Sequence, residues 1–550
     1  MMPMPWRLRR SIPPGPPPWL ALAKEWDLPP AAARLAWLRE ADAPGELAWR
    51  LDPAWSRCTD PYLLEGVAAA VARIREALAR DEGIVVYGDY DVDGVTATAL
   101  LVRVLEKLKA RVTFFIPNRF NDGYGLHLDC IREVVARDKP ALLISVDCGV
   151  RSVDEVRATG ELGVDWIITD HHALGETLPP AVAVVHPALG DYPNPNLAGV
   201  GVAFKLAQAL LDEHPSEAFL DGLLKLVALG TVADMVPLRG ENALLVKRGL
   251  TALSGANGPG VAALLKAAKV DGQVRAQNIG FGVGPRLNAV GRMGGAEDAV
   301  RLLLTRDPQE AETLMAQVEA LNLERRAIQK ELSQRLPPVG LEPFDLVVDP
   351  TAHKGVIGIV AGQRMRVSGK PSAVCTVVDG IAHCSVRAPE GYDLRPLLEA
   401  AKLYTLTGGG HRFAAGLTFP LSRLAFVAKT LQRGASEQAG TLPASALLVD
   451  GAGTALAPSR AELDRLEPFG QGFPEPSLVV QGTLDAPAKA FGEGHRKFKL
   501  PGETHEFTLF ASGEDEPLQG PLCLAVSPMD HARWGRSWRV DGFLAGQEGP

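Results

Sequence analysis

The sequence lacks the features of secreted, membrane-spanning and zinc-finger proteins. Its 550 residues include six scattered cysteines, at positions 58, 130, 148, 375, 384 and 523, and no Cys-x-x-Cys pair. This scatter predicts neither a disulfide framework nor a zinc finger, and it favours a reducing compartment. No run approaches the ~20 apolar residues of a membrane span, and a proline-rich stretch stands where a signal peptide needs an apolar core. We therefore expect a cytoplasmic protein without a membrane partner.

The sequence also has no excess of positive charge. The net charge of −8 gives no global attraction to nucleic acid, so a polyanion would need a local basic groove or bound metal ions. The hydrophobic fraction of 46% and the charged fraction of 22% are typical of a globular chain. At roughly 150 residues per domain, the length predicts three or four domains.

The order of apolar runs predicts an α/β catalytic unit. Strand-like runs occupy residues 84–87, 112–116, 141–146, 166–169 and 182–185, with helical stretches between most of them, one of them at 95–109. Continuous apolar strands alternating with helices are typical of a parallel, doubly wound sheet. A long helix follows, from Asp307-Pro308 to Pro337-Pro338, and a second α/β unit starts near residue 344. Short apolar runs between Gly, Pro and Asp turns predict an all-β domain from about residue 445.

These patterns divide the chain into five predicted segments. They are an irregular N-terminal extension at 1–60, a catalytic domain at 61–305, a connecting helix at 306–338, a smaller α/β domain at 339–440 and an all-β domain at 441–550. The extension is expected to pack on the domain that follows it.

Acidic residues and histidines stand where the predicted strands end. Asp89, Asp91 and Asp93 follow the first strand, Asp147 follows the third, and Asp170-His171-His172 follows the fourth. Ligands of open α/β sheets bind at the carboxyl ends of the strands, so these side chains are expected to converge. Asp234 is a further acid, in an otherwise apolar stretch, where an unpaired carboxylate is costly.

This set of side chains predicts a metal centre. Crowded carboxylates repel one another and resist ionising unless a hard cation offsets the charge. Oxygen ligands with one or two imidazoles and no thiolate favour Mg²⁺ or Mn²⁺, and the number of acids favours two ions. Such a centre suits phosphate-ester hydrolysis. Each residue alone is better explained as a turn acid, a helix cap or a core histidine, but these explanations account poorly for five polar groups together at strand ends.

The motifs resemble those of a known family. The stretches 89–94, 147–149, 170–172 and 230–234 resemble the ordered motifs of the DHH phosphoesterase superfamily, and those at 285–293, 355–361, 408–416 and 468–474 resemble its RecJ family. The resemblance implies a DHH catalytic domain, a connecting helix, a DHH-associated domain and an OB-fold-like domain. It also implies a 5′→3′ exonuclease of recombination and repair that acts on single-stranded DNA, with single-strand-binding protein and a helicase as partners.

The resemblance also implies roles for individual residues. Asp147 would bridge two Mn²⁺ or Mg²⁺ ions, with Asp91 on one ion and Asp93, His171 and Asp234 on the other. Asp89 would support the first ion or its water, Asp170 would orient His171, and His172 would face the scissile phosphate. Ser385 and Arg387 would hold the terminal 5′ phosphate. The further phosphate-binding residues implied are Arg119, Arg286, Gly409, Gly410 and His411.

Three positions depart from the family pattern. Tyr87 stands where many relatives place a metal-binding histidine, Ala352 replaces a customary tryptophan, and Phe473 replaces a customary asparagine. Two other functions remain open. One is a phosphodiesterase for cyclic dinucleotides or short oligonucleotides, against which the all-β domain argues. The other is a non-catalytic replication scaffold, against which the complete ligand set argues.

Overall fold

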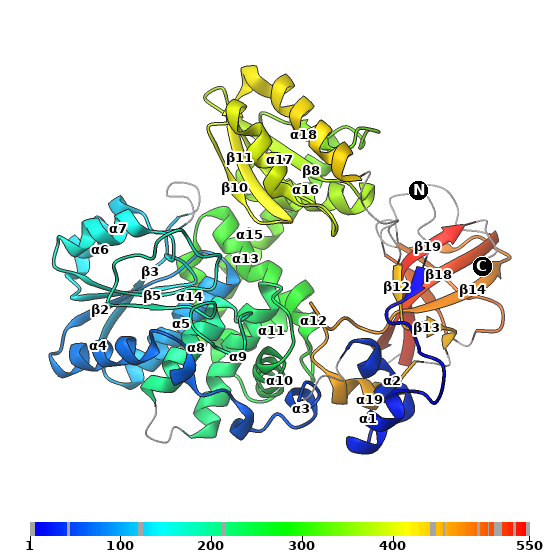
Figure 1. The fold of residues 1–550 in the computed structure, drawn as a ribbon, viewed down its shortest axis with the longest axis horizontal. Coiled ribbons are helices and arrows are strands. Elements are labelled where there is room, and N and C mark those ends of the chain that lie inside the picture. The colour runs from blue at the N-terminus through cyan, green and yellow to red at the C-terminus, as the bar shows by residue number, and fades with distance from the viewer. Residues whose placement is uncertain are drawn as a thin grey trace.

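A computed structural model describes residues 6–40, 45–118, 125–211, 216–439, 447–454, 457–491, 495–503, 505–510, 520–531 and 535–545. Figure 1 shows a large α/β domain, a smaller α/β domain above it, and a β domain to one side. Within these described ranges, no helix is both long enough and apolar enough to cross a membrane.

A five-stranded parallel sheet organises the large domain, as predicted. In sheet order the strands are β3 (Arg111–Phe115), β2 (Gly83–Tyr87), β4 (Leu142–Val146), β5 (Asp165–Thr169) and β6 (Ala183–Val185). Helices cover both faces because successive side chains of a strand point to opposite sides. Ile84 and Val86 join the core with α4 (Val67–Ala79), α5 (Val92–Lys107) and α8 (Gly199–Leu210), whereas Val85 and Tyr87 join the core with α6 (Leu128–Asp138) and α7 (Val153–Gly160).

The strand order creates a switch point beside β2. The chain passes from β2 to β3 on one side and then returns to place β4 on the other side. The loops that follow β2 and β4 therefore diverge, and ligands of open α/β sheets bind at such a point. The loop after β2 carries Asp89 and Asp91, the first turn of α5 that follows carries Asp93, and the loop after β4 carries Asp147.

Further helices complete the domain and lead out of it. They are α9 (Glu217–Ala233), α10 (Glu241–Leu253), α11 (Pro259–Ala267), α12 (Ala276–Asn278), the π-helix η3 (Ile279–Val283), α13 (Gly284–Met293), α14 (Ala296–Leu304) and the 28-residue α15 (Pro308–Arg335). The predicted ends of α15 are confirmed within a residue or two. Asp307 accepts the backbone N–H of Gln309 as its N-cap, and Pro308 takes the first position, where no N–H is needed.

The smaller α/β domain has a mixed sheet. In sheet order its strands are β10 (Thr407–Gly410), β11 (Ala414–Pro420), β9 (Ile381–Arg387), β8 (Ser372–Val378) and β7 (Asp345–Val348). Helix α16 (Lys354–Ser368) packs on one face with Ala352, which is 6% exposed. Helices α17 (Leu394–Ala401) and α18 (Leu424–Ala439) cover the other face.

The smaller α/β domain contains one disulfide, although the scattered cysteines predict no disulfide framework. Cys375 on β8 and Cys384 on β9 lie opposite each other in the antiparallel register, with Cα atoms 3.9 Å apart, and they are joined. The sequence separation of 9 residues reflects a hairpin rather than a framework. The remaining cysteines (58, 130, 148 and 523) are not joined in a disulfide.

The C-terminal domain is all-β, as predicted. Its sheet runs in the order β13 (Gly451–Ala452), β14 (Leu478–Leu484), β18 (Gly520–His531), β19 (Gly535–Ala545), β17 (Phe507–Leu509), β16 (His495–Phe498) and β15 (Lys489–Phe491). Phe498, Phe507 and Trp538 fill its core. A strip of basic residues, Arg496, Lys497 and Lys499, lies on and just after β16.

Contrary to the prediction from its sequence, the N-terminal segment is not irregular, and only its second part packs on the domain that follows it, where Trp49 and Trp55 contact the catalytic core. It forms β1 (Trp6–Leu8), α1 (Trp19–Glu25), α2 (Pro30–Leu38) and α3 (Ala48–Leu51). Strand β1 pairs in parallel with β12 (Leu447–Val449), and the helices share a core with α19 (Arg460–Leu466). Apolar residues of the segment are thus buried against the distant C-terminal part of the chain.

Two buried arginines fix this junction and explain Phe473. The Arg39 guanidinium makes two hydrogen bonds to the Asp450 carboxylate, of 2.9 and 3.0 Å. The Arg50 guanidinium donates to the carbonyls of Pro468 and Leu238. Phe473 is fully buried, with its ring centre 3.5 Å from Arg50 Cζ. The aromatic ring therefore takes a cation–π position between the arginines, where the amide of an asparagine could not stack in the same way.

Candidate metal centre

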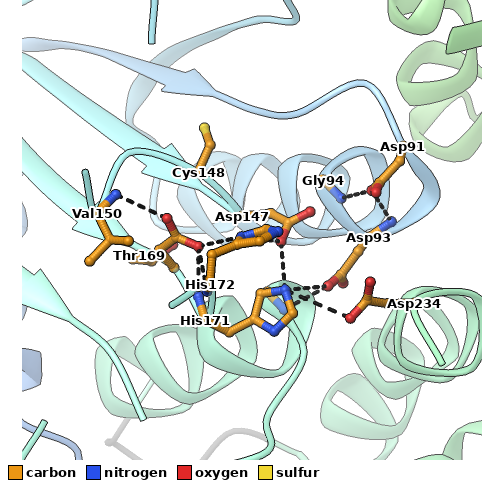
Figure 2. Close-up of polar contacts among 12 residues, drawn as sticks. Asp91, Asp93, Gly94, Asp147, Cys148, Val150, Thr169, His171, His172 and Asp234 are labelled. Carbon is orange, nitrogen blue, oxygen red and sulfur yellow. Dashed lines mark hydrogen bonds and ion pairs between the residues drawn. The ribbon is translucent and has the colours of Figure 1, made fainter. Parts of the chain in front are cut away.

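The strand ends bring acids and histidines into one cluster. Three overlapping groups have ligand atoms within 4.8 Å of one another: Asp89, Asp91 and Asp147; Asp93, His171 and Asp234; and Asp147, His171 and His172. Figure 2 shows the His171 ring directed at Asp147, Asp93 and Asp234. All five residues predicted as metal ligands are therefore brought together, with Asp89 beside them.

The first motif is a helix start rather than a free turn. The sequence predicted a helix after Gly94, but α5 begins at Val92 with Asp91 as its N-cap. Asp91 Oδ1 accepts the backbone N–H groups of Asp93 and Gly94 at 2.9 and 3.1 Å. An N-cap carboxylate is favoured there because it satisfies N–H groups that have no partner within the helix.

Asp93 is held by the start of a second helix. Its two carboxylate oxygens accept the backbone N–H groups of Gly199 and Val200, at 2.6 and 2.8 Å, where α8 begins. The positive end of the α8 dipole therefore faces this buried acid. The same close packing explains Gly199, because a Cβ atom at this position would lie 2.4 Å from Asp147 Oδ1.

Asp147 and His171 carry the polar atoms that best fit a cation. Asp147 has a left-handed backbone with φ of +63°, an uncommon conformation for an aspartate. Its Oδ1 atom lies 3.1 Å from His171 Nε2, and both atoms are buried without a hydrogen bond. Asp93 Oδ2 and Asp234 Oδ2 lie 3.8 and 3.7 Å from the same nitrogen. Buried polar atoms normally have a partner, and a divalent cation would supply one here.

The protonation of the acids also fits a cation. Burial, followed by the charge of Asp91, raises the pKa of Asp93 from 3.8 to about 7. Burial and the charge of Asp93 raise the pKa of Asp234 to about 8, and burial and the charges of Asp93 and Asp91 raise the pKa of Asp147 well above its ordinary value. A bound cation reverses this effect because it stabilises the ionised form.

The two histidines are driven to opposite protonation states. Burial, followed by the charge of His172, lowers the pKa of His171 to about 3, so His171 is neutral at pH 7 and can offer a lone pair to a metal. Burial alone would lower the pKa of His172, but the hydrogen bond and charge of Asp170 raise it to about 9. Opposite shifts in neighbouring groups are typical of a site that divides ligand and acid roles.

Asp170 acts on a different ring from the one predicted. Its Oδ1 accepts from His172 Nδ1 at 2.8 Å, whereas from His171 it accepts only the backbone N–H, at 2.7 Å. Asp170 Oδ2 accepts the backbone N–H of Val150 at 2.9 Å. Burial would raise the pKa of Asp170, but the bonds and charge of His172 outweigh burial and lower it to about 2. The pair is therefore an imidazolium–carboxylate pair near neutral pH.

The smaller domain reaches the cluster through His411. The His411 and His172 rings are stacked, with centres 6.4 Å apart. On β9, Arg387 Nη1 donates to Ser385 Oγ at 3.0 Å, and both side chains lie beside Gly358 of α16. Gly409 and Gly410 lie on β10, an exposed strand paired with β11 on one side. The structure thus places these candidates on the domain that faces the cluster.

The other predicted residues are placed differently. Arg286 forms an ion pair with Glu319 of α15, with Nε and Oε2 2.7 Å apart, so its charge is already paired within the protein. Arg119 lies outside the described residues. Tyr87 is fully buried against Phe115 and Trp166, with ring centres 5.3 and 6.5 Å away. Tyr87 therefore belongs to the hydrophobic core between the sheet and helices α6 and α7.

Sequence reasoning missed His186. This residue follows β6 and is 2% exposed, and its Nε2 atom lies 2.7 Å from the carbonyl oxygen of His172. Its position after a strand end was the available signal, since the other site residues were found in the same way. A single histidine without a motif, however, is usually a core residue.

Comparisons with known proteins agree with this architecture. The DHH family N-terminal domain matches residues 83–231, the DHHA1 domain matches 344–437, and the RecJ OB domain matches 458–534. The chain is 36% identical over 477 residues to the single-stranded-DNA-specific exonuclease RecJ of Bacillus subtilis. This match covers 84% of this chain and 60% of that protein. It is 38% identical to the protein of the same name from Dickeya dadantii, covering 80% of this chain and 81% of that protein.

A solved structure shows the same fold. The crystal structure of RecJ from Thermus thermophilus in complex with Mn²⁺ is similar with a TM-score of 0.82 and 30% sequence identity, over 99% of this chain and 80% of that one. The likeness spans all three domains. The chain belongs to the RecJ family of the DHH phosphoesterase superfamily.

Proposed function

We propose that the protein is a metal-dependent exonuclease that degrades single-stranded DNA from the 5′ end and releases 5′-mononucleotides in DNA recombination and repair. One observation carries this proposal. Asp91, Asp93, Asp147, His171 and Asp234 come from separate segments and converge at the switch point of the sheet, where buried ligand atoms of Asp147 and His171 have no hydrogen bond. The relatives and the solved structure named above supply the substrate and the metal by analogy.

Each side chain has a role that follows from its surroundings. Two Mn²⁺ or Mg²⁺ ions, when bound, would activate water and neutralise charge on the phosphodiester. Asp147 would bridge them, with Asp91 on one side and Asp93, His171 and Asp234 on the other. Asp89 is buried next to Asp91 and Asp147, where it would support the first ion or its water.

The imidazolium of His172 supplies positive charge at the reacting phosphate. Asp170 keeps His172 protonated and fixes its ring through Nδ1, so the Nε2–H is the group that can donate outward. A charged donor of this kind stabilises negative charge that develops on a phosphoryl oxygen and can protonate the leaving oxygen. Because the pKa of His172 lies above neutral pH, the side chain is suited to acid catalysis or charge stabilisation and not to base catalysis.

Recognition of a strand end would lie on the smaller domain. Arg387 and Ser385 offer a guanidinium and a hydroxyl for a terminal 5′ phosphate, and His411 lies over His172. A fixed distance between the end-binding pair and the cluster would favour release of one nucleotide at a time. The basic residues of β16 would bind the strand farther from its end by charge, as the basic grooves of OB folds do. Single-strand-binding protein and a helicase are the expected partners.

A labelled-DNA assay tests the proposal. Purified protein with Mn²⁺ is given single-stranded and duplex DNA, labelled at the 5′ or the 3′ end, with Asp147→Ala as the inactive control. Early release of labelled mononucleotide from the 5′-labelled single strand alone supports the proposal. Preference for dinucleotides would instead support a small-substrate phosphodiesterase, and binding without cleavage would support a scaffold.

A further inference from the structure

The loop that carries both active-site histidines is held from two sides. On its amide side, Asp170 Oδ1 accepts the backbone N–H groups of His171 and His172 at 2.7 and 3.0 Å. On its carbonyl side, His186 Nε2 lies 2.7 Å from the His172 oxygen, and Arg151 Nε donates to the Ala173 oxygen at 2.7 Å. The backbone of His172 is thus fixed at both its N–H and its C=O group.

The bonds of His186 define its tautomer. The backbone N–H of Ala188 donates to His186 Nδ1 at 3.0 Å, so Nδ1 is the acceptor and carries no proton. The proton of the neutral ring then resides on Nε2, which donates to the His172 carbonyl. Burial lowers the pKa of His186, in agreement with a neutral ring.

His186 is therefore not a metal ligand. Both ring nitrogens are engaged by backbone groups, so neither offers a lone pair to a cation. The ring is 2% exposed and reaches the site only through the His172 carbonyl. Its contribution must be transmitted through the backbone of residues 171–173.

That backbone sets the direction of both rings. His171 Nε2 is placed 3.1 Å from Asp147 Oδ1, and His172 Nδ1 is placed 2.8 Å from Asp170 Oδ1. Rotation about the His172 Cα–C bond would turn the segment that carries both rings relative to the peptide after His172. A donor on the carbonyl prevents this rotation, because a turned peptide would leave the Nε2–H of His186 buried without an acceptor.

We propose that His186 is a positioning residue that sets the geometry of His171 and His172, and through it the affinity of the centre for divalent cations. The inference deepens the proposed function and rests on it for the identity of the metal centre. Groups that orient metal ligands through hydrogen bonds commonly change metal affinity by about 10- to 100-fold when removed. His186 acts one step farther away, through the main chain, and we expect an effect near the lower end.

A matched pair of variants tests the donor. In His186→Gln the side-chain amide can place an N–H near the former Nε2 position, whereas His186→Met has similar length without a donor. Mn²⁺ binding is measured without DNA, by the electron paramagnetic resonance signal of free Mn²⁺. We expect His186→Met to raise the apparent Kd by about tenfold and His186→Gln to stay within about twofold of the unmodified protein.

Two results would overturn the inference. Unchanged Mn²⁺ affinity in His186→Met would remove any positioning role, and an equal loss in both variants would assign the effect to ring shape rather than to the donor. Circular dichroism confirms that each variant is folded, and His186→Phe replaces the Met variant if that one is not. The Mn²⁺ measurement contains no DNA and is therefore independent of cleavage. Failure of the protein to cleave single-stranded DNA would contradict the proposed function without changing this measurement.

Discussion

Replacing Asp170 by Asn should move the pH dependence of the enzyme. The Asp170 carboxylate is the largest influence that raises the pKa of His172 to about 9, against an ordinary value of 6.5. The difference corresponds to about 3 kcal/mol of stabilisation of the imidazolium. Without the negative charge, burial is opposed only by the weaker effects of Asp234 and Asp91, and the pKa of His172 falls towards its ordinary value.

The expected loss depends on pH in a defined direction. A histidine with a pKa near 9 is about 97% protonated at pH 7.5, whereas one with a pKa near 6.5 is about 9% protonated. If the imidazolium is the active form, Asp170→Asn should lower kcat/KM about tenfold at pH 7.5 and much less at pH 6. The alkaline limb of activity should move from near pH 9 to near pH 6.5.

The assay is the pH profile of kcat/KM on 5′-phosphorylated single-stranded DNA with saturating Mg²⁺. Asp165→Asn is the matched control. Asp165 is the first residue of β5 and Asp170 follows the last, so the two acids lie at opposite ends of that strand, and Asp165 Oδ2 pairs with Arg73 Nε at 2.6 Å. That control should keep the alkaline limb near pH 9. An Asp170→Asn profile with an unmoved alkaline limb would refute the assignment of charge to His172.

Four other predictions follow from the site. Asp147→Ala should abolish cleavage and leave strand binding in a gel-shift assay largely intact; retained cleavage would remove Asp147 from the centre. Arg387→Ala should reduce the preference for 5′-phosphorylated over 5′-hydroxyl ends about tenfold, as loss of a charged hydrogen bond implies, whereas the exposed-arginine control Arg395→Ala should not. Gly199→Ala should weaken Mn²⁺ binding in calorimetry, because its Cβ would lie 2.4 Å from Asp147 Oδ1; equal affinity would contradict that packing. Metal removal should destabilise the protein more at pH 8 than at pH 5. In the folded state without metal Asp93 keeps its proton up to about pH 7, whereas in the unfolded state it releases the proton near pH 3.8. The stability of the metal-free protein therefore falls as the pH rises between these two values. Melting temperatures with and without Mn²⁺ check this, and an equal gain at both pH values would contradict it.

The catalytic sheet and most of its ligands could be predicted because their signals are local. Each strand is a short apolar run, and Asp91, Asp147 and His171 directly follow such runs. Once parallel strands are inferred, convergence at one edge is a geometric necessity. The predicted start of α5 is three residues too late, because Asp91 is itself the N-cap and the helix begins at Val92.

The remaining features depend on contacts between distant parts of the chain. No local pattern tells which ring Asp170 will contact, since both histidines follow it directly. The partner of Arg286 is Glu319 on another helix, and an arginine in a motif gives no sign of it. The role of His186 requires knowledge of a carbonyl 14 positions earlier, on a neighbouring loop. Such pairings are set by packing, which periodicity does not report.

The junction between the chain ends has a consequence for biosynthesis. The apolar residues of α2 are buried against Leu463, Leu466 and Phe473, and the Arg39 guanidinium meets Asp450, 411 positions later. During translation the N-terminal segment emerges first, yet its partners are made near the end. It must therefore remain without its core while the catalytic domain is being synthesised and begins to fold. The amino terminus, although made first, is among the last parts of the protein to reach its final structure.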